Sequence, residues 1–195
     1  MRHHIGIAIR MTILTAVLLG LIYPLAITGI AQVAFPGAAD GSLVRANGRV
    51  VGSSLIAQDF AQAKYFHPRP SAAGRGYDAM ASAASNLGPT SRTLIDRVKA
   101  DVRAQVAGNP GLRLGAVPVD MVTTSGSGLD PDITVANARA QAPRVAAARG
   151  MSTAAVLRTV AAQTTGRTLG VLGEPRVNVL ELNLALDAAR KAGGH

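Results

Sequence analysis

Residues 11–35 form an apolar stretch that dominates the N-terminal end of this sequence. The run from Met11 to Phe35, MTILTAVLLGLIYPLAITGIAQVAF, contains no charged residue. An α-helix rises roughly 1.5 Å per residue, so about 20 apolar residues cross the roughly 30 Å hydrocarbon core of a bilayer. Nothing after Phe35 repeats the pattern. We therefore predict a transmembrane helix over residues 11–35, with a tail of residues 1–10 before it and one domain, residues 36–195, after it.

A cleavable signal peptide is the main alternative to a retained anchor. Signal peptides also begin with basic residues, but their apolar region is usually about 7 to 15 residues long. This stretch is longer, although Gly29 and Ala31 form a small-x-small sequence after which a peptidase could cleave. Tyr23-Pro24 lies near the middle of the run. A proline is tolerated in a membrane helix because neighbouring spans can satisfy the freed carbonyl, so we expect a retained helix that packs against other spans.

The basic residues around the apolar run predict its orientation. Arg2 and Arg10 precede it, and the positive-inside rule then places the short N-terminal tail in the cytoplasm and the folded body outside. Arg45 and Arg49 follow the run and reduce this asymmetry. We expect a single-pass protein of the cell (inner) membrane with an extracytoplasmic body.

The composition of the rest of the chain excludes several kinds of site. Cysteine is absent, so disulfides, thiol catalysis and thiolate metal sites are excluded. Residues 36–195 carry 18 basic and 11 acidic residues, a formal charge of +7. The arginines are dispersed and aromatic residues make up only 3% of the chain, so we expect no nucleic-acid partner. No second shift in composition divides this region, which is long enough to bury one sizeable core.

Local patterns near the start of the domain predict a small sheet and an ordered loop. The favoured turn pair Asn47-Gly48 predicts a hairpin between residues 43–46 and 49–57. Further on, Pro68 and Pro70 push the residues before them towards extended geometry, which excludes a regular helix.

The middle of the domain shows the apolar spacing of a helix. Apolar residues spaced four apart after Ser91 predict an amphipathic helix that closes at Gly108. The β-branched content of Val117–Val122 favours a strand. Asp130-Pro131 is typical of an N-cap followed by proline in the first turn, and predicts a helix that Pro143 should interrupt.

Two helix starts are predicted near the C-terminus. Ser152 is placed to cap one helix. Asn178 and Glu181 resemble a capping box with asparagine in place of serine or threonine, and they predict the last helix. The fold class expected overall is α+β: one N-terminal transmembrane helix, then a single helix-rich α+β extracytoplasmic domain with a small sheet.

Motifs for catalysis and cofactors are weak in this sequence. No Walker phosphate loop is present, and the four histidines and the acids show no metal-ligand spacing. Glycines around Ser127 suggest an exposed nucleophile, but the Gly-x-Ser-x-Gly spacing is missing and His67 is the only candidate base within the folded body. An anchored hydrolase using Ser127 and His67 stays open as a minor alternative, and we predict no catalytic residue and no directly bound cofactor or metal.

Short blocks spread over nearly the whole chain resemble the C chain of the high-affinity potassium-transporting ATPase, the Kdp complex. They occur in the order and spacing of that family, and together they are specific although each alone is weak. Ala57 stands where the family usually has glycine, and Asp132 stands where it usually has histidine, so no proton-sensitive role is carried over to Asp132. The blocks are Tyr23-Pro24, Gly52 to Ile56, Tyr65-Phe66, Arg69 to Ala72, Ser85 to Pro89, Ser125 to Pro131, Arg144 to Ala146 and Leu172 to Asn183.

The resemblance implies an accessory, non-catalytic subunit of a P-type ATPase complex that takes up K⁺. It implies as partners a channel-like K⁺-binding subunit, an ATP-hydrolysing subunit and a second small single-span subunit, with ATP and K⁺ handled by the complex. We interpret the body as an extracytoplasmic cap on the channel-like subunit that stabilises assembly. The alternative is the role described for the family, a catalytic chaperone that directly raises the ATP affinity of the hydrolysing subunit.

The residues expected to matter fall into three groups. Met11, Tyr23, Pro24 and Phe35 mark the membrane span. Asn178 and Glu181 are expected to hold the last helix. The positions expected to contact a partner or order the loops are Arg69, Ser71, Asn86, Gly128, Asp130 and Arg144.

Overall fold

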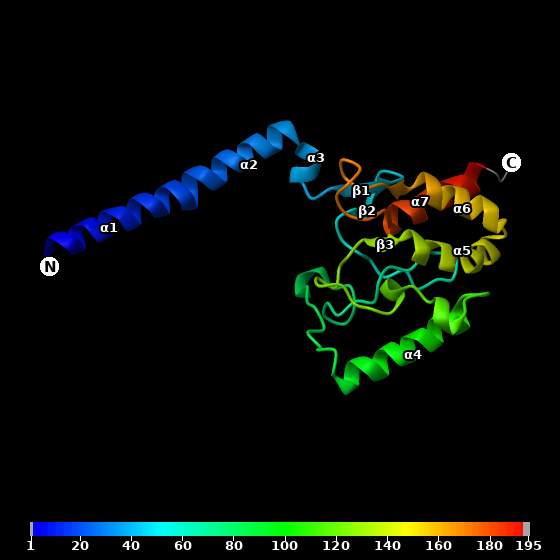
Figure 1. Ribbon diagram of the computed structural model, residues 1–195. Coiled ribbons are helices and arrows are strands. Elements are labelled where there is room, and N and C mark those ends of the chain that lie inside the picture. The colour runs from blue at the N-terminus through cyan, green and yellow to red at the C-terminus, as the bar shows by residue number, and fades with distance from the viewer. Residues whose placement is uncertain (1, 193–195) are drawn as a thin grey trace. The chain divides into compact units, whose positions relative to one another are not determined.

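The computed structural model describes residues 2–192. These residues form a mixture of helices and strands, with one long N-terminal apolar helix and two small sheets. This confirms the α+β class. The chain divides into two compact units, Met1–Ser53 and Ser54–His195. Figure 1 shows the first unit in blue to cyan and the second in cyan to red.

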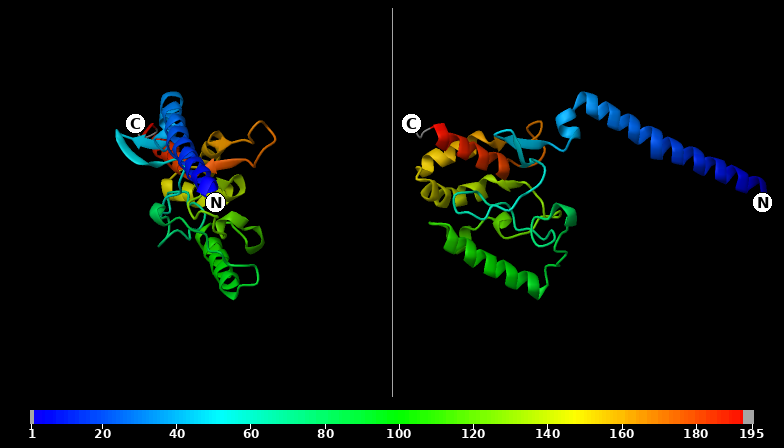
Figure 2. Two further views of the ribbon diagram at one scale, coloured as in Figure 1. Left: turned by 90° about the vertical axis from the view of Figure 1, so that its left-hand side faces the viewer. Right: turned by 180° about the vertical axis from the view of Figure 1, so that it is seen from behind.

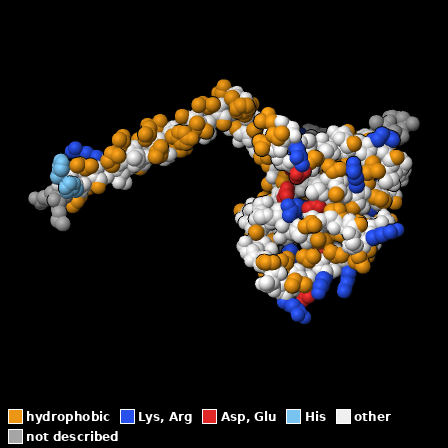
Figure 3. All heavy atoms as spheres, in the orientation of Figure 1, with side chains coloured by type: hydrophobic (Ala, Val, Ile, Leu, Met, Phe, Trp, Pro, Cys, Tyr) orange, Lys and Arg blue, Asp and Glu red, His pale blue; other side chains and the backbone are white. Residues whose placement is uncertain are grey.

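The first unit begins with a continuous helix built from three segments: α1 (Arg2–Val17), the π-helical η1 (Leu18–Ile22) and α2 (Tyr23–Ala34). The helix His3–Ala34 is long and apolar enough to cross a membrane, and its most apolar 18-residue stretch is not buried in the protein. Figure 3 shows hydrophobic side chains along the length of this helix, with charged and histidine side chains at its N-terminal end. A short helix, α3 (Pro36–Ala39), follows.

The π-helical turn explains how Pro24 fits inside the span. A proline ring collides with the carbonyl of the residue four positions earlier, here Gly20, and its nitrogen has no hydrogen to donate. The Tyr23 N–H donates to the Leu18 carbonyl, five residues back, so the helix widens directly before Pro24. The helix therefore continues through the proline.

The first unit ends in the predicted hairpin. Strands β1 (Leu43–Ala46) and β2 (Arg49–Ser53) pair antiparallel. Asn47 and Gly48 have positive φ of 51° and 78°, as a type I′ turn requires. The second strand ends at Ser53, four residues earlier than expected.

The second unit is built around a three-stranded antiparallel sheet in the order β3-β5-β4, formed by β3 (Asp132–Thr134), β4 (Thr164–Thr165) and β5 (Arg176–Asn178). Helices α5 (Val135–Arg149) and α7 (Val179–Ala192) pack against the sheet, and α6 (Thr153–Ala162) packs against both helices. Figures 1 and 2 show these helices side by side at one end of the unit. Their shared core contains Phe66, Ile133, Val145, Val156, Val160, Val177, Leu182 and Leu186.

The remaining elements of the second unit are more peripheral. The amphipathic helix α4 (Arg92–Gly108) is present as predicted and is capped by the Ser91 hydroxyl, but none of its residues is fully buried. Three short 3₁₀ turns, η2 (Ala79–Ala81), η3 (Leu114–Ala116) and η4 (Val119–Met121), interrupt the long irregular segments on either side of it. These irregular segments carry most of the candidate residues.

Three local predictions are wrong, those for Val117–Val122, Asp130-Pro131 and Pro143. Val117–Val122 is not a strand, because the Asp120 side chain turns inward from η4 and accepts hydrogen bonds from Thr134 and Asn137. Asp130-Pro131 does not start a helix. It leads into β3, and the helix starts only at Val135 with Thr134 as its cap.

Pro143 lies inside α5 without ending it. The neighbouring Ala142, Val145 and Ala146 are at most 2% exposed. Burial of this face in the core outweighs the lost backbone hydrogen bond. The Ser152 cap of α6 is present as predicted, with the hydroxyl accepting from the Ala155 N–H.

Candidate functional site

Arg69 links the long irregular segment 54–90 to residues 123–130, which precede β3. Its guanidinium donates to the Asp130 carboxylate at 3.0 Å and to the Thr123 and Thr124 carbonyls at 3.3 and 3.1 Å. The two charged side chains are 25% and 30% exposed, so water screens the pair only in part. The other Asp130 oxygen accepts from the Asp132 N–H, which fixes the turn into β3. Asp130 is thus a loop-ordering residue here.

Ser71 makes a second link between the same two segments. Its hydroxyl donates to the Gly128 carbonyl at 2.6 Å and accepts from the N–H groups of Ala73 and Tyr77. Burial, together with the negative charge of Asp59, raises the pKa of Tyr77 to about 12. The Tyr77 hydroxyl therefore stays protonated and donates to the Arg69 carbonyl at 2.9 Å.

Gly128 lies where two backbone segments meet. It has a positive φ of 68°, and a Cβ at this position would stand 2.6 Å from the Ala83 carbonyl oxygen and 2.7 Å from the Ala73 nitrogen. Only glycine has both the backbone freedom and the small volume that this site requires. Beside it, the Ser127 carbonyl accepts from the Ala83 N–H and the Ser82 hydroxyl.

Arg144, on α5, binds a different part of the irregular segment, residues 63–65. Its guanidinium donates to the carbonyls of Ala63 and Tyr65 and to the side-chain oxygens of Asn109 and Gln141, all within 3.0 Å. Burial lowers the pKa of Arg144 from its ordinary value. The arginine joins α5 to residues 63–65 and to the end of α4.

Two amide side chains that the sequence analysis missed hold the same segment against the helices. Asn183 on α7 accepts from the Phe66 N–H at 2.8 Å and donates to the Phe66 carbonyl at 3.0 Å. Gln141 on α5 does the same for the N–H and carbonyl of His67, at 2.8 and 3.0 Å. Each amide replaces a strand partner for a backbone that belongs to no sheet. Both amides are buried, and no local sequence pattern marks either of them.

The other expected residues lie apart from these clusters. Asn86 adopts a positive φ of 51° in the loop before α4, a turn role that asparagine tolerates. Asn178 caps α7 by accepting from the Glu181 N–H, and its amide donates to the Ser54 carbonyl. Met11, Tyr23 and Pro24 lie on the exposed N-terminal helix, and Phe35 is its C-cap.

The structure gives no support to an anchored hydrolase. The Ser127 hydroxyl accepts from the Leu129 N–H, while the nearest partner of the His67 ring is the Gln62 carbonyl at 3.3 Å. No hydrogen bond joins Ser127 to His67 within residues 2–192, so the required nucleophile–base pair is missing. The same range holds no cluster of three or more histidine and acidic side chains suited to a metal ion.

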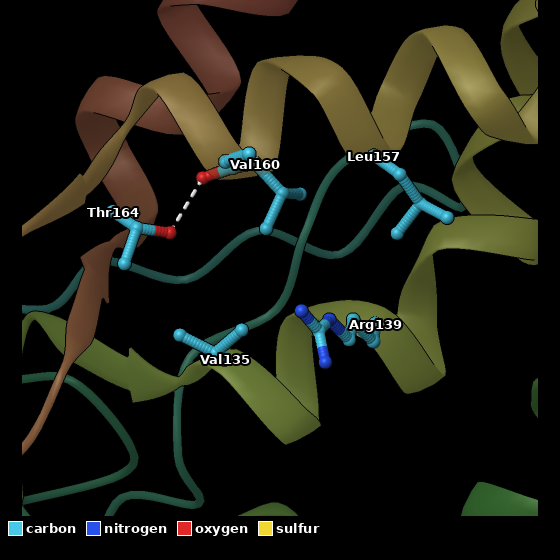
Figure 4. Close-up of a pocket in the computed structure, with 6 residues that line it drawn as sticks. Val135, Arg139, Leu157, Val160 and Thr164 are labelled. Carbon is cyan, nitrogen blue, oxygen red and sulfur yellow. Dashed lines mark hydrogen bonds between the residues drawn. The ribbon is translucent and has the colours of Figure 1, made fainter.

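A hollow of about 500 Å³ lies between α5 and α6, lined by aliphatic side chains together with Arg139 and Thr164. Figure 4 shows the Arg139 guanidinium facing Leu157 and Val160 across it, with the Thr164 hydroxyl bonded to the Val160 carbonyl. A second hollow of about 350 Å³ borders Arg69, Asp130, Asp132, Glu174 and Arg176, where Asp130 and Asp132 are each paired with an arginine.

His67 provides a pH prediction for the unit. Burial and the nearby Arg144 charge lower its pKa below the ordinary value of 6.5, against smaller opposing effects of Gln62 and Asp59. The unfolded chain therefore binds a proton more readily than the folded one, so stability falls as the pH drops below about 6.5. In urea titrations of the full chain in detergent, we expect His67→Gln to lose less stability than the wild type between pH 7.5 and 5.5. Equal losses in the two proteins would contradict the assignment.

Comparison with known proteins identifies the family. The family model described as K⁺-transporting ATPase, c chain, matches residues 5–188. The chain belongs to this family. It is 62% identical over 176 residues to the potassium-transporting ATPase KdpC subunit of Caulobacter vibrioides (strain NA1000 / CB15N), covering 90% of this chain and 88% of that one. The KdpC subunit of Caulobacter sp. (strain K31) is 58% identical and covers 100% and 98%, and that of Koribacter versatilis is 53% identical and covers 97% of both.

Family membership confirms the resemblance derived from the sequence blocks. It makes the chain a subunit of a K⁺-transporting ATPase, and the long apolar helix is consistent with a membrane subunit. The clusters around Arg69, Gly128 and Arg144 accordingly belong to a protein that works as part of a complex.

Proposed function

We propose that this chain is an accessory subunit that stabilises assembly of the ATP-driven K⁺ uptake complex, with its second unit as an extracytoplasmic cap on the channel-like subunit. The observation that carries the proposal is the way the irregular segments are held. Side chains, rather than a sheet, fix residues 63–83 and 123–131 at Arg69, Ser71, Gln141, Arg144 and Asn183. A surface ordered in this way, without a nucleophile–base pair, suits recognition of another protein.

The proposed partners are those that the family resemblance implies. They are the channel-like K⁺-binding subunit, the ATP-hydrolysing P-type subunit and a second single-span subunit, together with the lipid bilayer. In this proposal ATP and K⁺ are bound by the other subunits, and the chain influences ATP hydrolysis through assembly and helix packing.

The experiment compares complexes formed with the full chain, with residues 1–53 alone, and without the chain. We expect the full chain to restore complex yield and K⁺-stimulated ATP hydrolysis, and residues 1–53 alone to leave both low. The purified chain should bind no photoreactive ATP analogue. Full recovery with residues 1–53 would contradict a role for the second unit, and specific labelling of the purified chain would favour the catalytic-chaperone alternative.

A further inference from the structure

The loop between β4 and β5 exposes three large aliphatic side chains within four residues. Leu169, Val171 and Leu172 are 86%, 72% and 58% exposed. No other stretch between residues 54 and 189 places three exposed large apolar side chains so close together. Figure 2 (left) shows this loop, in orange, extending away from the helices of the second unit. We call residues 168–172 the apolar tip.

The tip is held in a defined shape. The Thr168 N–H donates to the Leu172 carbonyl at 2.8 Å, and the Leu172 N–H donates back to the Thr168 carbonyl at 3.0 Å. The N–H groups of Gly170 and Val171 are also bonded within the loop. Four of the five backbone donors of the tip are therefore satisfied before anything covers it, so moving it into an apolar surface would not cost their hydrogen bonds.

Leu169 is the most unusual residue of the tip. Its φ is 54°, a left-handed backbone that is unfavourable for leucine and ordinary for glycine. The strain aims a large apolar side chain at solvent, where it gains nothing within this chain. Local strain of this kind is found at binding sites, where a partner compensates for it.

The charges at the base of the loop favour a protein partner over a lipid surface. Arg167 donates two hydrogen bonds, each 2.8 Å long, to the Glu174 carboxylate across the base. Arg176 is likewise paired with Asp132 at 3.0 Å. Loops that bind anionic headgroups present free basic side chains, whereas here the arginines flanking the tip are neutralised.

We propose that the apolar tip inserts into an apolar groove on another subunit of the transport complex. The inference rests on the proposed function and adds the element that makes the contact. The Arg167–Glu174 pair would lie at the rim of the groove, with Leu169, Val171 and Leu172 in its centre, the arrangement of an apolar core and polar rim seen in protein interfaces.

Single-cysteine labelling tests this proposal, since the chain has no cysteine of its own. The variant Val171→Cys is reacted with a polar maleimide, both in the purified complex and as the purified chain in the same detergent. We expect the reaction to be at least tenfold slower in the complex. Met80→Cys, at a position that is 98% exposed on a separate turn, is the control and should change less than twofold. Equal rates for Val171→Cys in the complex and the free chain would overturn the proposal.

Two further measurements test whether the tip contacts the lipid bilayer or a second copy of the chain instead. A bimane label on the introduced thiol of the free Val171→Cys chain, reconstituted with brominated lipids, would be quenched if the tip enters the bilayer. Protection of the free chain that grows with its concentration would indicate a second copy of the chain. Either result would overturn the proposal. The proposed function is tested separately and fails if the wild-type chain does not restore complex yield. If the Val171→Cys chain restores complex yield but its thiol stays reactive, only the proposed role of the tip is overturned.

Discussion

Replacing Gly128 by alanine should lower the free energy of unfolding by about 3 kcal/mol, from the combined cost of a left-handed backbone and an overpacked contact. The new Cβ would stand 2.6 Å from the Ala83 carbonyl oxygen and 2.7 Å from the Ala73 nitrogen. Both neighbours are backbone atoms, which cannot move aside as a flexible side chain can. Urea titration of the full chain in detergent, followed by tyrosine fluorescence, measures the loss.

Gly150→Ala is the matched control for this variant. Gly150 has nearly the same φ, 66°, but nothing lies within 4 Å of the position its Cβ would take. It ends α5, so the substitution should cost only about 1 kcal/mol for the backbone conformation. Equal losses at positions 128 and 150 would show that the two segments do not meet at Gly128 as described.

Replacing Asn183 by leucine should also destabilise the chain by about 3 kcal/mol, because it leaves a buried donor and a buried acceptor without partners. Asn183 is 1% exposed, and Phe66, whose N–H and carbonyl it binds, is fully buried. Leucine has a similar volume, so the loss would measure the two hydrogen bonds rather than a cavity. The same urea titration reports it.

Gln163→Leu is the control for Asn183→Leu. Gln163 lies at the end of α6, and its side-chain amide makes no hydrogen bond within residues 2–192. The substitution makes a similar change from amide to branched aliphatic, and it should alter stability by less than about 0.5 kcal/mol. A loss at Asn183 no larger than at Gln163 would mean that the segment at Phe66 does not depend on the amide.

Elements with strong local signals were predictable from the sequence. The apolar run, the Asn47-Gly48 turn, the apolar spacing after Ser91 and the Ser152 cap each depend on a few neighbouring residues, and each predicted element is found in the structure. Asp130-Pro131 gave an equally local signal that misled, because the Asp130 carboxylate is taken by Arg69, 61 residues away. Tertiary contacts of this kind override a local capping preference.

The identity of most candidate residues was predictable from the sequence, but their contacts with one another were not. Two separate blocks supplied Arg69 with Ser71 and Gly128 with Asp130, and the structure brings the two pairs together in one network. Asn183 was present in a quoted block but was not selected, since its role depends on the distant backbone of Phe66. No sequence pattern reveals that a side-chain amide will replace a strand.

The apolar tip was also not predictable from the sequence. The aliphatic residues between Gly166 and Gly173 show no periodic pattern in the sequence. Their exposure, the positive φ of Leu169 and the pairing of Arg167 with Glu174 are visible only in three dimensions.

The proposed function requires the folded body to lie outside the membrane, away from the cytoplasmic nucleotide. Labelling of Met80→Cys with a membrane-impermeant maleimide in spheroplasts tests it directly, with His4→Cys in the N-terminal tail as the opposite-side control. We expect the Met80→Cys variant to react in intact spheroplasts and the His4→Cys variant to react only after lysis. Reaction of Met80→Cys only after lysis would place the body in the cytoplasm and contradict the proposed extracytoplasmic cap.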